Sequence, residues 1–212
     1  MEHLHIQPGE EFKTLQTEFG DWKGWLCSFA IDANGSTVGE NGNSSSLSSP
    51  FDLELLKSLR SQADCIVTTG ETARTEHYKA SKYAPIAFLT RSPESIKEIP
   101  AFSQRGEFEN IVFSEFDDSV LFPEVKVALE IKGFKKLLFE GGASSLRSLI
   151  AQCKTVSILA SISNSADPSL IDPAKALQGL IGDDFQGVIT KDLVTDTNRI
   201  TQWSISTSPA AQ

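Results

Sequence analysis

At residues 137–144 the chain reads LLFEGGAS, an apolar run followed by two glycines. Its apolar residues predict a strand, and the segment from Ser144 to Cys153 carries an apolar pattern typical of a helix. Between them, Gly141 and Gly142 would let a phosphate approach the main chain, and the helix start would offer unpaired N–H groups. A tight strand-to-helix turn that merely needs glycine is the alternative. The stretch is not the G-x-G-x-x-G dinucleotide fingerprint.

Strands and helices alternate along the chain on both sides of this stretch. Short apolar runs bounded by breaking residues predict strands, and apolar residues spaced three to four apart predict helices. Strands are expected at 25–31, 64–69, 85–89, 110–113, 136–139 and 156–160, and helices at 50–60, 70–74, 125–131 and 144–153. The alternation predicts an α/β fold with a mostly parallel central sheet and right-handed crossovers. Segments 186–190 and 200–205 have no helix between them and predict a C-terminal antiparallel hairpin.

Two segments in the first quarter of the chain are expected to be largely irregular. Residues 1–20 are predicted to form an irregular N-terminal arm with a short helix around Glu10–Phe19. Residues 34–49 are rich in Asn, Gly and Ser and predict a loop. The next helix is expected to begin at Ser49, because the proline and aspartate that follow it suit a first helical turn.

Composition and charge restrict the class of protein. With 212 residues, 40% of them hydrophobic and 22% charged, the chain is expected to fold as a single globular domain, residues 1–212. The net charge of −9 argues against nucleic acid as a partner, because duplex binding relies on Lys and Arg to neutralise phosphates. No apolar stretch approaches the roughly 18 residues of a membrane span, and the N-terminus has no apolar signal region. The expected location is therefore cytoplasmic, without a membrane partner.

The cysteines and histidines form no metal or redox motif in the sequence. Cys27, Cys65 and Cys153 lie far apart in apolar runs, so each is expected to be a small buried residue. The three histidines show no ligand spacing beyond one i, i+2 pair in the predicted arm. No metal site is expected.

Two further strand ends carry side chains suited to a nucleotide. Thr90, Arg91 and Ser92 follow a predicted strand, where hydroxyls and a guanidinium could grip a 2′-phosphate. A solvated loop arginine is the alternative. Residues 68–76, which read TTGETARTE, form another strand-to-helix junction whose hydroxyls and backbone could meet ligand atoms. Here the alternative is a capped helix with Glu71 in its first turn.

In their order along the chain, these segments resemble the C-terminal reductase domain of bifunctional riboflavin-biosynthesis deaminase/reductases, and most closely its actinobacterial version. This is a dihydrofolate-reductase-like family, which implies a three-layer domain. The resemblance covers roughly residues 21–163. Four stretches carry it: Trp25 to Gly35 with the Ser-x-Asp-Gly signature, Leu47 to Asp52 with Leu59-Arg60, Ala63 to Tyr78, and the Glu-Gly-Gly turn of Phe139 to Gly142.

The resemblance implies an NADPH-dependent 5-amino-6-(5-phosphoribosylamino)uracil reductase that acts as a homodimer on a phosphorylated pyrimidine. NADPH would deliver hydride to an imine form of the ribose C1′ and open the ring to a ribityl chain. The implied site residues are Asp32, Asn34 and Glu140 for catalysis, Thr69, Gly70, Thr72, Thr90, Arg91, Ser92, Gly141, Gly142 and Ala143 for the cofactor, and Ser49, Thr72 and Glu76 for the substrate. The chain carries no H-x-E with P-C-x-x-C zinc signature, so deamination would need another protein.

The chain departs from the family pattern at three places. Asn34 falls on the family's aspartate, unless an alternative placement keeps Asp32 and inserts two residues before Gly35. Glu71 puts a carboxylate where a cofactor would come close, which is unfavourable beside a phosphate. Thr155-Val156 replaces an acidic pair. These departures favour a second hypothesis, a catalytically silent relative that binds a nucleotide or a partner, and a third is a reductase for another substrate.

Overall fold

The structure, a computed structural model, describes residues 2–4, 6, 10–39, 47–163 and 167–206. Its strands are β1 (Glu2–His3), β2 (Gly24–Asp32), β3 (Cys65–Thr69), β4 (Ile86–Leu89), β5 (Ile111–Phe113), β6 (Lys136–Phe139), β7 (Thr155–Ser163), β8 (Gln186–Val194) and β9 (Arg199–Ser206). Its α-helices are α1 (Glu11–Phe19), α2 (Pro50–Gln62), α3 (Gly70–Thr75), α4 (Pro100–Ser103), α5 (Leu121–Ile131), α6 (Ala143–Gln152) and α7 (Pro173–Ile181), with the 3-10 helices η2 (Pro93–Glu98) and η3 (Pro168–Leu170).

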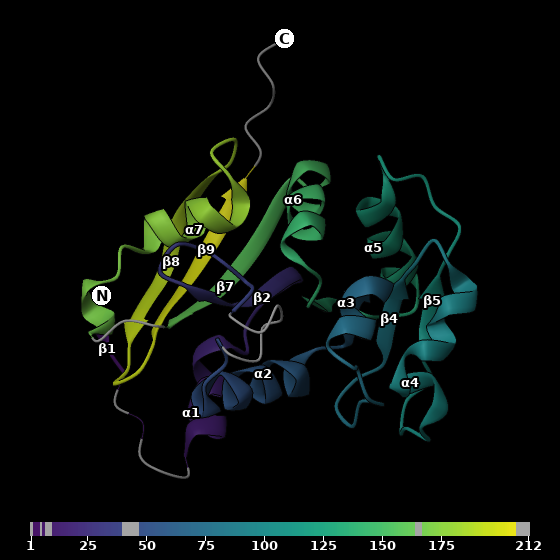
Figure 1. The fold of residues 1–212 in the computed structure, drawn as a ribbon, viewed down its shortest axis with the longest axis horizontal. Coiled ribbons are helices and arrows are strands. Elements are labelled where there is room, and N and C mark those ends of the chain that lie inside the picture. Colours follow the sequence, from purple (N-terminus) through teal and green to yellow (C-terminus); the bar gives the residue numbers. More distant parts are fainter. Residues whose placement is uncertain (1, 5, 7–9, 40–46, 164–166, 207–212) are drawn as a thin grey trace.

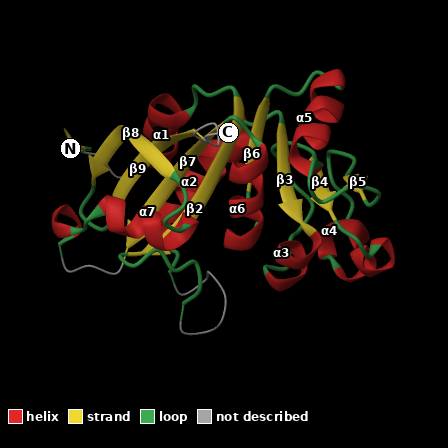
Figure 2. Ribbon diagram, turned by 90° about the horizontal axis from the view of Figure 1, so that it is seen from above, coloured by secondary structure: helices red, strands yellow, loops and turns green. Residues whose placement is uncertain are grey.

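In the described part of the chain, all nine strands join one sheet in the order β1-β8-β9-β7-β2-β6-β3-β4-β5. Helices lie on both faces of this sheet, so the molecule has three layers (Figures 1 and 2). From β7 across to β5 every neighbouring pair is parallel, whereas β9 runs antiparallel to both β7 and β8. The predicted mostly parallel sheet with a C-terminal antiparallel hairpin is confirmed.

Two parts of the chain differ from the prediction. The described residues between 2 and 20 are more regular than predicted, because α1 packs beside α2 and β1 extends the sheet along the end of β8. The short helix expected in this segment is present. Helix α7 was not predicted, although its start carries a recognisable signal: the Asp172 side chain accepts hydrogen bonds from the N–H groups of Ala174 and Lys175, and Pro173 follows it.

Each face of the sheet has its own buried core. Helices α5, α6 and α7 cover one face, and α1 to α4 contribute buried side chains to the other. On the first face, the rings of Trp25, Phe122 and Phe139 meet edge to face, with centroids 5.7 to 6.3 Å apart. Aromatic pairs in this geometry add to the free energy of burial. Because Phe139 ends β6, this cluster fixes the point at which the chain leaves the sheet toward α6.

The order of the connections places a site at the middle of the sheet. Strand β2 is followed by α2 on one face, whereas its neighbour β6 is followed by α6 on the other. Adjacent parallel strands whose connections leave to opposite faces open a crevice at their carboxyl ends, where open α/β sheets bind ligands. In this chain the crevice lies beyond the ends of β6 and β3 and along β2.

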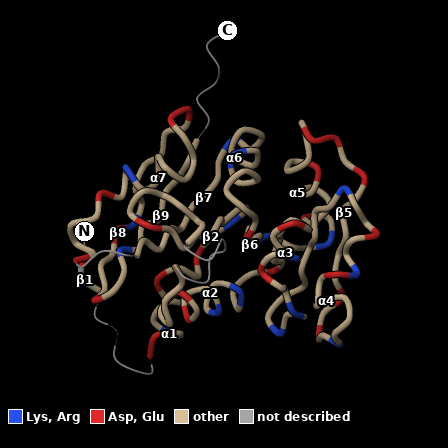
Figure 3. Tube along the Cα trace, in the orientation of Figure 1, with Lys and Arg blue, Asp and Glu red and all other residues tan. Residues whose placement is uncertain are grey.

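Lys and Arg are interspersed with Asp and Glu along the described trace and do not gather on one element (Figure 3). Among the described residues, no helix is long and apolar enough to cross a membrane.

A glycine-to-glycine contact joins the turn after β2 to α7. Gly35 has a φ of +82°, and a Cβ placed on it would lie 2.3 Å from the main-chain oxygen of Ala176. A Cβ on Gly179 of α7 would lie 1.8 Å from the main-chain oxygen of Asn34. Both positions therefore require glycine, because the two backbones touch there.

We predict that Gly179→Ala destabilises the fold by about 1–3 kcal/mol, the usual range for overpacking a tight contact. In an ordinary helix, replacing glycine by alanine stabilises the protein by roughly 0.5–1 kcal/mol. The sign of the change in unfolding free energy therefore shows whether the tight contact exists. Urea denaturation measures the difference. Lys175→Ala, an exposed position on the same helix, serves as the control and should change stability little. A Gly179→Ala variant more stable than the wild type would contradict the contact.

The cysteines behave as small core residues at two of their three positions. Cys27 and Cys65 are fully buried, as predicted, whereas Cys153 at the end of α6 is only partly buried. Burial raises the pKa of the Cys65 thiol from 9.0 to about 12, and it raises the pKa of Cys27 well above its usual value. Both thiols are therefore neutral in the folded protein at physiological pH.

This burial predicts a loss of stability at alkaline pH. Below pH 9 the Cys65 thiol is protonated in both states, so stability is unaffected; between about 9 and 12 only the unfolded chain ionises, so stability falls. Each thiol contributes at most about 1.4 kcal/mol per pH unit to that fall. Urea denaturation at pH 8 to 11 should therefore give a shallower decline for Cys65→Ala than for the wild type. Parallel declines would show that the buried thiol does not ionise on unfolding.

Candidate functional site

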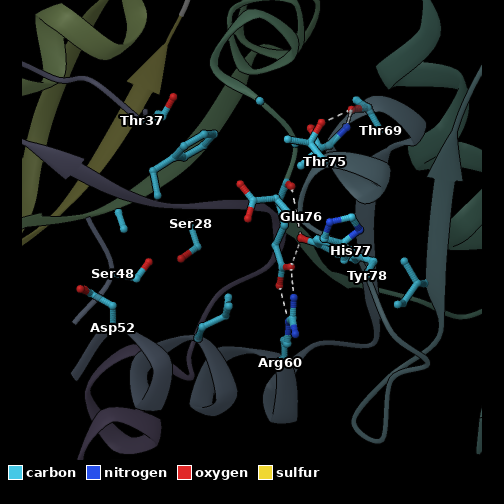
Figure 4. A pocket seen from close by; sticks show the side chains of 18 of the residues that line it. Ser28, Thr37, Ser48, Asp52, Arg60, Thr69, Thr75, Glu76, His77 and Tyr78 are labelled. Atoms are coloured by element: carbon cyan, nitrogen blue, oxygen red, sulfur yellow. Dashed lines mark hydrogen bonds and ion pairs between the residues drawn. The ribbon is translucent and has the colours of Figure 1, made fainter. Parts of the chain in front are cut away.

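A cavity of about 1010 Å³ occupies the crevice at the middle of the sheet. Residues 28–30 of β2 line one side, α2 forms the base, and residues 69–83 and 140–145 form the opposite walls. In the view of Figure 4, Ser28, Ser48 and Asp52 lie toward one side of this space, and Thr69 and Thr75 lie toward the other. Its volume is at the upper end of the range of small-molecule and cofactor sites.

The carboxylate of Glu140 is held between two elements at the base of the cavity. It accepts hydrogen bonds from Arg60 Nε (2.8 Å) and Nη2 (2.5 Å), and from the hydroxyl of Tyr78 (2.6 Å) (Figure 4). The main-chain oxygen of Glu140 also accepts from Thr68 Oγ1 at 3.0 Å. Because the Glu140 side chain is only 4% exposed, this bidentate pair is largely shielded from water.

The charges of this group are fixed by its surroundings. Burial raises the pKa of Tyr78 well above its usual value, and the negative charge of Glu140 raises it further, so the hydroxyl keeps its proton. Burial alone would lower the pKa of Arg60, but the Glu140 carboxylate outweighs it and the net shift is upward. Glu140, a predicted catalytic residue, therefore lies between a permanent cation and a neutral donor, and it anchors the turn that follows it.

The two glycines of the predicted turn have different physical roles. A Cβ on Gly141 would lie 2.3 Å from the ring of Phe139, so the packing of that ring requires glycine there. A Cβ on Gly142 would meet only Thr72 Oγ1, at 3.6 Å, which is ordinary contact. Gly142 lines the cavity and precedes α6, which has no side-chain cap and no acidic residue in its first turn. The tight turn thus explains why residue 141 is glycine. At Gly142 and Ala143, by contrast, the main chain borders space that a ligand could fill.

The start of α3 faces the same part of the cavity. Thr69 caps this helix by accepting from the Thr72 N–H at 3.2 Å, and its hydroxyl donates to Thr72 Oγ1 at 2.9 Å. Thr69, Glu71, Thr72 and Glu76 all line the cavity. The structure therefore contains the capped helix and also brings its polar side chains to the crevice.

The predicted 2′-phosphate residues lie beside this helix and outside the cavity wall. Thr90 is buried, and a Cβ on Gly70 would lie 3.0 Å from its Oγ1, so the turn after β4 packs on the start of α3. Ser92 is exposed, and its N–H donates to Thr90 Oγ1 at 3.1 Å. The Arg91 guanidinium forms an exposed bidentate ion pair with Asp118. Gly70, Thr90, Arg91 and Ser92 do not line the cavity.

Asp32 and Asn34 build the turn after β2. Asp32 Oδ1 accepts from the N–H groups of Asn34 (2.8 Å) and Ser36 (2.9 Å), and the side chain of Asn34 is exposed. Neither residue lines the cavity. A further departure from the family pattern, Thr155-Val156, starts β7 and also lies outside the cavity lining.

Ser49 and Asp52 form a capping box at the start of α2. Ser49 Oγ accepts from the Asp52 N–H at 3.2 Å, and Asp52 Oδ2 accepts from the Ser49 N–H at 2.7 Å. The fully buried Asn198, from the β8–β9 turn, donates to Asp52 Oδ1 at 3.2 Å and to Ser161 Oγ at 3.0 Å. Asp52 and Ser161 line the cavity, whereas Ser49 lies behind that wall.

Sequence reasoning assigned no site role to several residues that the structure brings together. Arg60, Tyr78, Ser28, Ser161 and Asn198 come from five separate segments. A signal existed for the first three, since they lie in stretches that carry the family resemblance, whereas Ser161 and Asn198 lie outside those stretches. Among the described residues, no group of three or more His, Cys, Asp or Glu side chains could hold a metal ion.

The strand order, the helix layers and the central cavity define a dihydrofolate-reductase-like α/β domain. A pyrimidine reductase-like protein from Corynebacterium diphtheriae shares the fold at 16% identity and a TM-score of 0.61, over 91% of this chain and 98% of that one. A deaminase/5-amino-6-(5-phosphoribosylamino)uracil reductase from Thermotoga maritima shares it at 14% identity and a TM-score of 0.62, over 92% of this chain and 59% of that one. These structures confirm the predicted likeness of fold to the riboflavin-biosynthesis reductases.

The likeness extends to dihydrofolate reductase itself. The enzyme from Enterococcus faecalis, whose structure is a complex with NADP(H), matches at 14% identity and a TM-score of 0.52, over 88% of this chain and 99% of that one. No protein-family model matches the chain, and no curated protein matches it. At these identities the comparisons establish the fold.

We predict that Glu140→Gln destabilises the protein by roughly 2–3 kcal/mol, somewhat less than for a fully buried pair because Arg60 is 27% exposed. Tyr78→Phe removes a single hydrogen bond to a charged acceptor and should cost about 1.5 kcal/mol. Thermal and urea denaturation measure both effects. Glu54→Gln, which breaks the exposed pair with Lys57, is the matched control and should change stability by less than about 1 kcal/mol. Equal effects of Glu140→Gln and Glu54→Gln would contradict the anchoring role of Glu140.

Proposed function

We propose that this chain is an NADPH-dependent reductase of the pyrimidine-reductase type, acting on a phosphorylated ribosylamino-pyrimidine. The observation that carries the proposal is the central cavity, with Gly142 and the uncapped start of α6 on its wall. A helix start without a side-chain cap offers N–H groups and a favourable dipole to a phosphate. The reductases with this fold named above give the reaction class.

The residues around the cavity fit a nicotinamide dinucleotide. The main chain at Gly142 and Ala143 would hold the pyrophosphate, since no Cβ occupies the space in front of Gly142. The hydroxyls of Thr69 and Thr72 lie next to that position. The adenosine end would then point toward the turn formed by residues 90–92. When bound, the dinucleotide supplies the hydride, and the protein provides binding, orientation and exclusion of water.

The remaining space would take the substrate. Ser28 and Ser161 present hydroxyls on the sheet side, Phe29 presents an aromatic ring, and Glu76 lies on the wall opposite. This mixture suits a ligand with a planar ring and a hydroxylated chain. The imine carbon at the ribose C1′ would receive the hydride, and a proton from solvent would go to the attached nitrogen. The cytoplasmic location and the homodimer that the resemblance implies are part of the same proposal.

A catalytically silent nucleotide-binding relative is the second candidate. Two observations favour it: the Asp32 carboxylate is engaged in its own turn, and the Glu140 carboxylate is engaged by Arg60 and Tyr78. Asp32 also lies outside the cavity lining, and the Glu140 carboxylate is held by an ion pair, so neither is placed to exchange a proton with a substrate in the cavity. Oxidation of NADPH in the presence of the pyrimidine substrate, followed by absorbance, distinguishes the candidates, because the silent relative would bind the nucleotide without turnover.

The proposal predicts micromolar binding of NADPH by the purified chain. Gly142→Val should weaken this binding at least about tenfold, because the added isopropyl group would fill the space in front of the α6 N–H groups. Isothermal titration calorimetry measures both affinities. Ala151→Val, an exposed position near the other end of α6, is the matched control and should bind like the wild type. Absence of wild-type binding at millimolar nucleotide would rule out the reductase.

A further inference from the structure

Glu71 is placed between the two ends of the proposed dinucleotide site. Its neighbour Thr72 lies next to Gly142: a Cβ added to Gly142 would be 3.6 Å from Thr72 Oγ1. Its other neighbour, Gly70, packs against Thr90, with an added Cβ 3.0 Å from Thr90 Oγ1. The pyrophosphate position and the turn of residues 90–92 therefore flank Glu71. The adenosine ribose of a dinucleotide that joins them would pass this residue.

Glu71 brings a negative charge to that position. It is exposed, it lines the cavity, and it stands in the first turn of α3. Three other acidic side chains line the cavity, and each of them interacts with other residues. Asp52 and Glu140 are buried and hydrogen-bonded, and Glu76 also has an interaction partner. A carboxylate beside the adenosine ribose can accept a hydrogen bond from a 2′-hydroxyl, but it repels a 2′-phosphate.

The cation expected to receive a 2′-phosphate is already engaged. Arg91 uses both Nε and Nη2 for the carboxylate of Asp118, and their side chains are 73% and 60% exposed. A pair this exposed contributes little to stability, so a phosphate can displace it. The Asp118 charge nevertheless stays close to the guanidinium and partly cancels its attraction for a second anion.

We propose that Glu71 sets the dinucleotide selectivity of this site and, with a smaller contribution from Asp118, removes most of the preference for NADPH, so that NADH binds with similar affinity. The inference rests on the proposed reductase function and concerns the adenosine end of the same cavity. Selectivity here is the difference between the affinities for NADPH and for NADH, and Glu71 changes it by disfavouring NADPH. The carboxylate would accept the ribose 2′-hydroxyl of NADH and oppose the 2′-phosphate of NADPH.

The test is calorimetric titration of the full chain with NADPH and with NADH, for the wild type, Glu71→Gln and Asp118→Asn. The wild-type Kd values should agree within about threefold, and Glu71→Gln should shift the ratio toward NADPH by roughly tenfold, as expected when one close like charge is removed. Asp118→Asn should shift it in the same direction by less. The Glu71→Gln effect should shrink as salt rises, because it is electrostatic.

Glu107→Gln is the matched control, since it removes the same charge from an exposed position outside the cavity lining. It should leave the ratio unchanged, and melting curves without nucleotide verify that all variants fold. A wild-type preference for NADPH above about a hundredfold would overturn the inference, as would an equal effect of Glu71→Gln on both nucleotides. Those results leave the reductase proposal standing. If neither nucleotide binds, both the reductase proposal and the proposed role of Glu71 are overturned.

Discussion

The arrangement of the site depends on one ion pair, the bidentate contact between Arg60 and Glu140. It joins α2 to the end of β6, and the hydroxyl of Tyr78 adds the wall that follows α3. Because the carboxylate is almost entirely shielded from water, loss of a partner would leave a charge that the surroundings cannot solvate. Glu140 also starts the glycine turn, so a single residue joins the base of the cavity to two of its walls. Glu140, which the sequence predicts as a catalytic residue, therefore also anchors the site.

The cavity itself follows from the order of the strands. Since β2 and β6 are neighbours whose connections leave to opposite faces, their carboxyl ends cannot be covered by either helix layer. The aromatic cluster of Trp25, Phe122 and Phe139 fixes the end of β6, and the ring of Phe139 excludes a side chain at residue 141. Packing on one face of the sheet therefore determines how closely a ligand can approach the main chain at the crevice.

Much of this fold could be predicted from the sequence, because its buried strands are short apolar runs between breaking residues. The glycine turn and the Thr-rich junction were recognised for the same local reason. The side-chain partners were not, since Arg60 and Tyr78 lie 80 and 62 positions from Glu140. Nor could the sequence indicate that Arg91 pairs with Asp118, 27 positions away. Contacts between distant segments depend on the sheet order, which a local pattern does not contain.

In the proposed reductase, the crevice beyond β6 binds a dinucleotide through the main chain at Gly142 and the start of α6. A crystal structure of the chain grown with NADPH tests it most directly. We expect the pyrophosphate in front of Gly142 and Ala143, with the adenosine ribose beside Glu71 and the nicotinamide toward Ser28. A nucleotide bound at another place, or a crevice closed by its own side chains in crystals saturated with nucleotide, would contradict it.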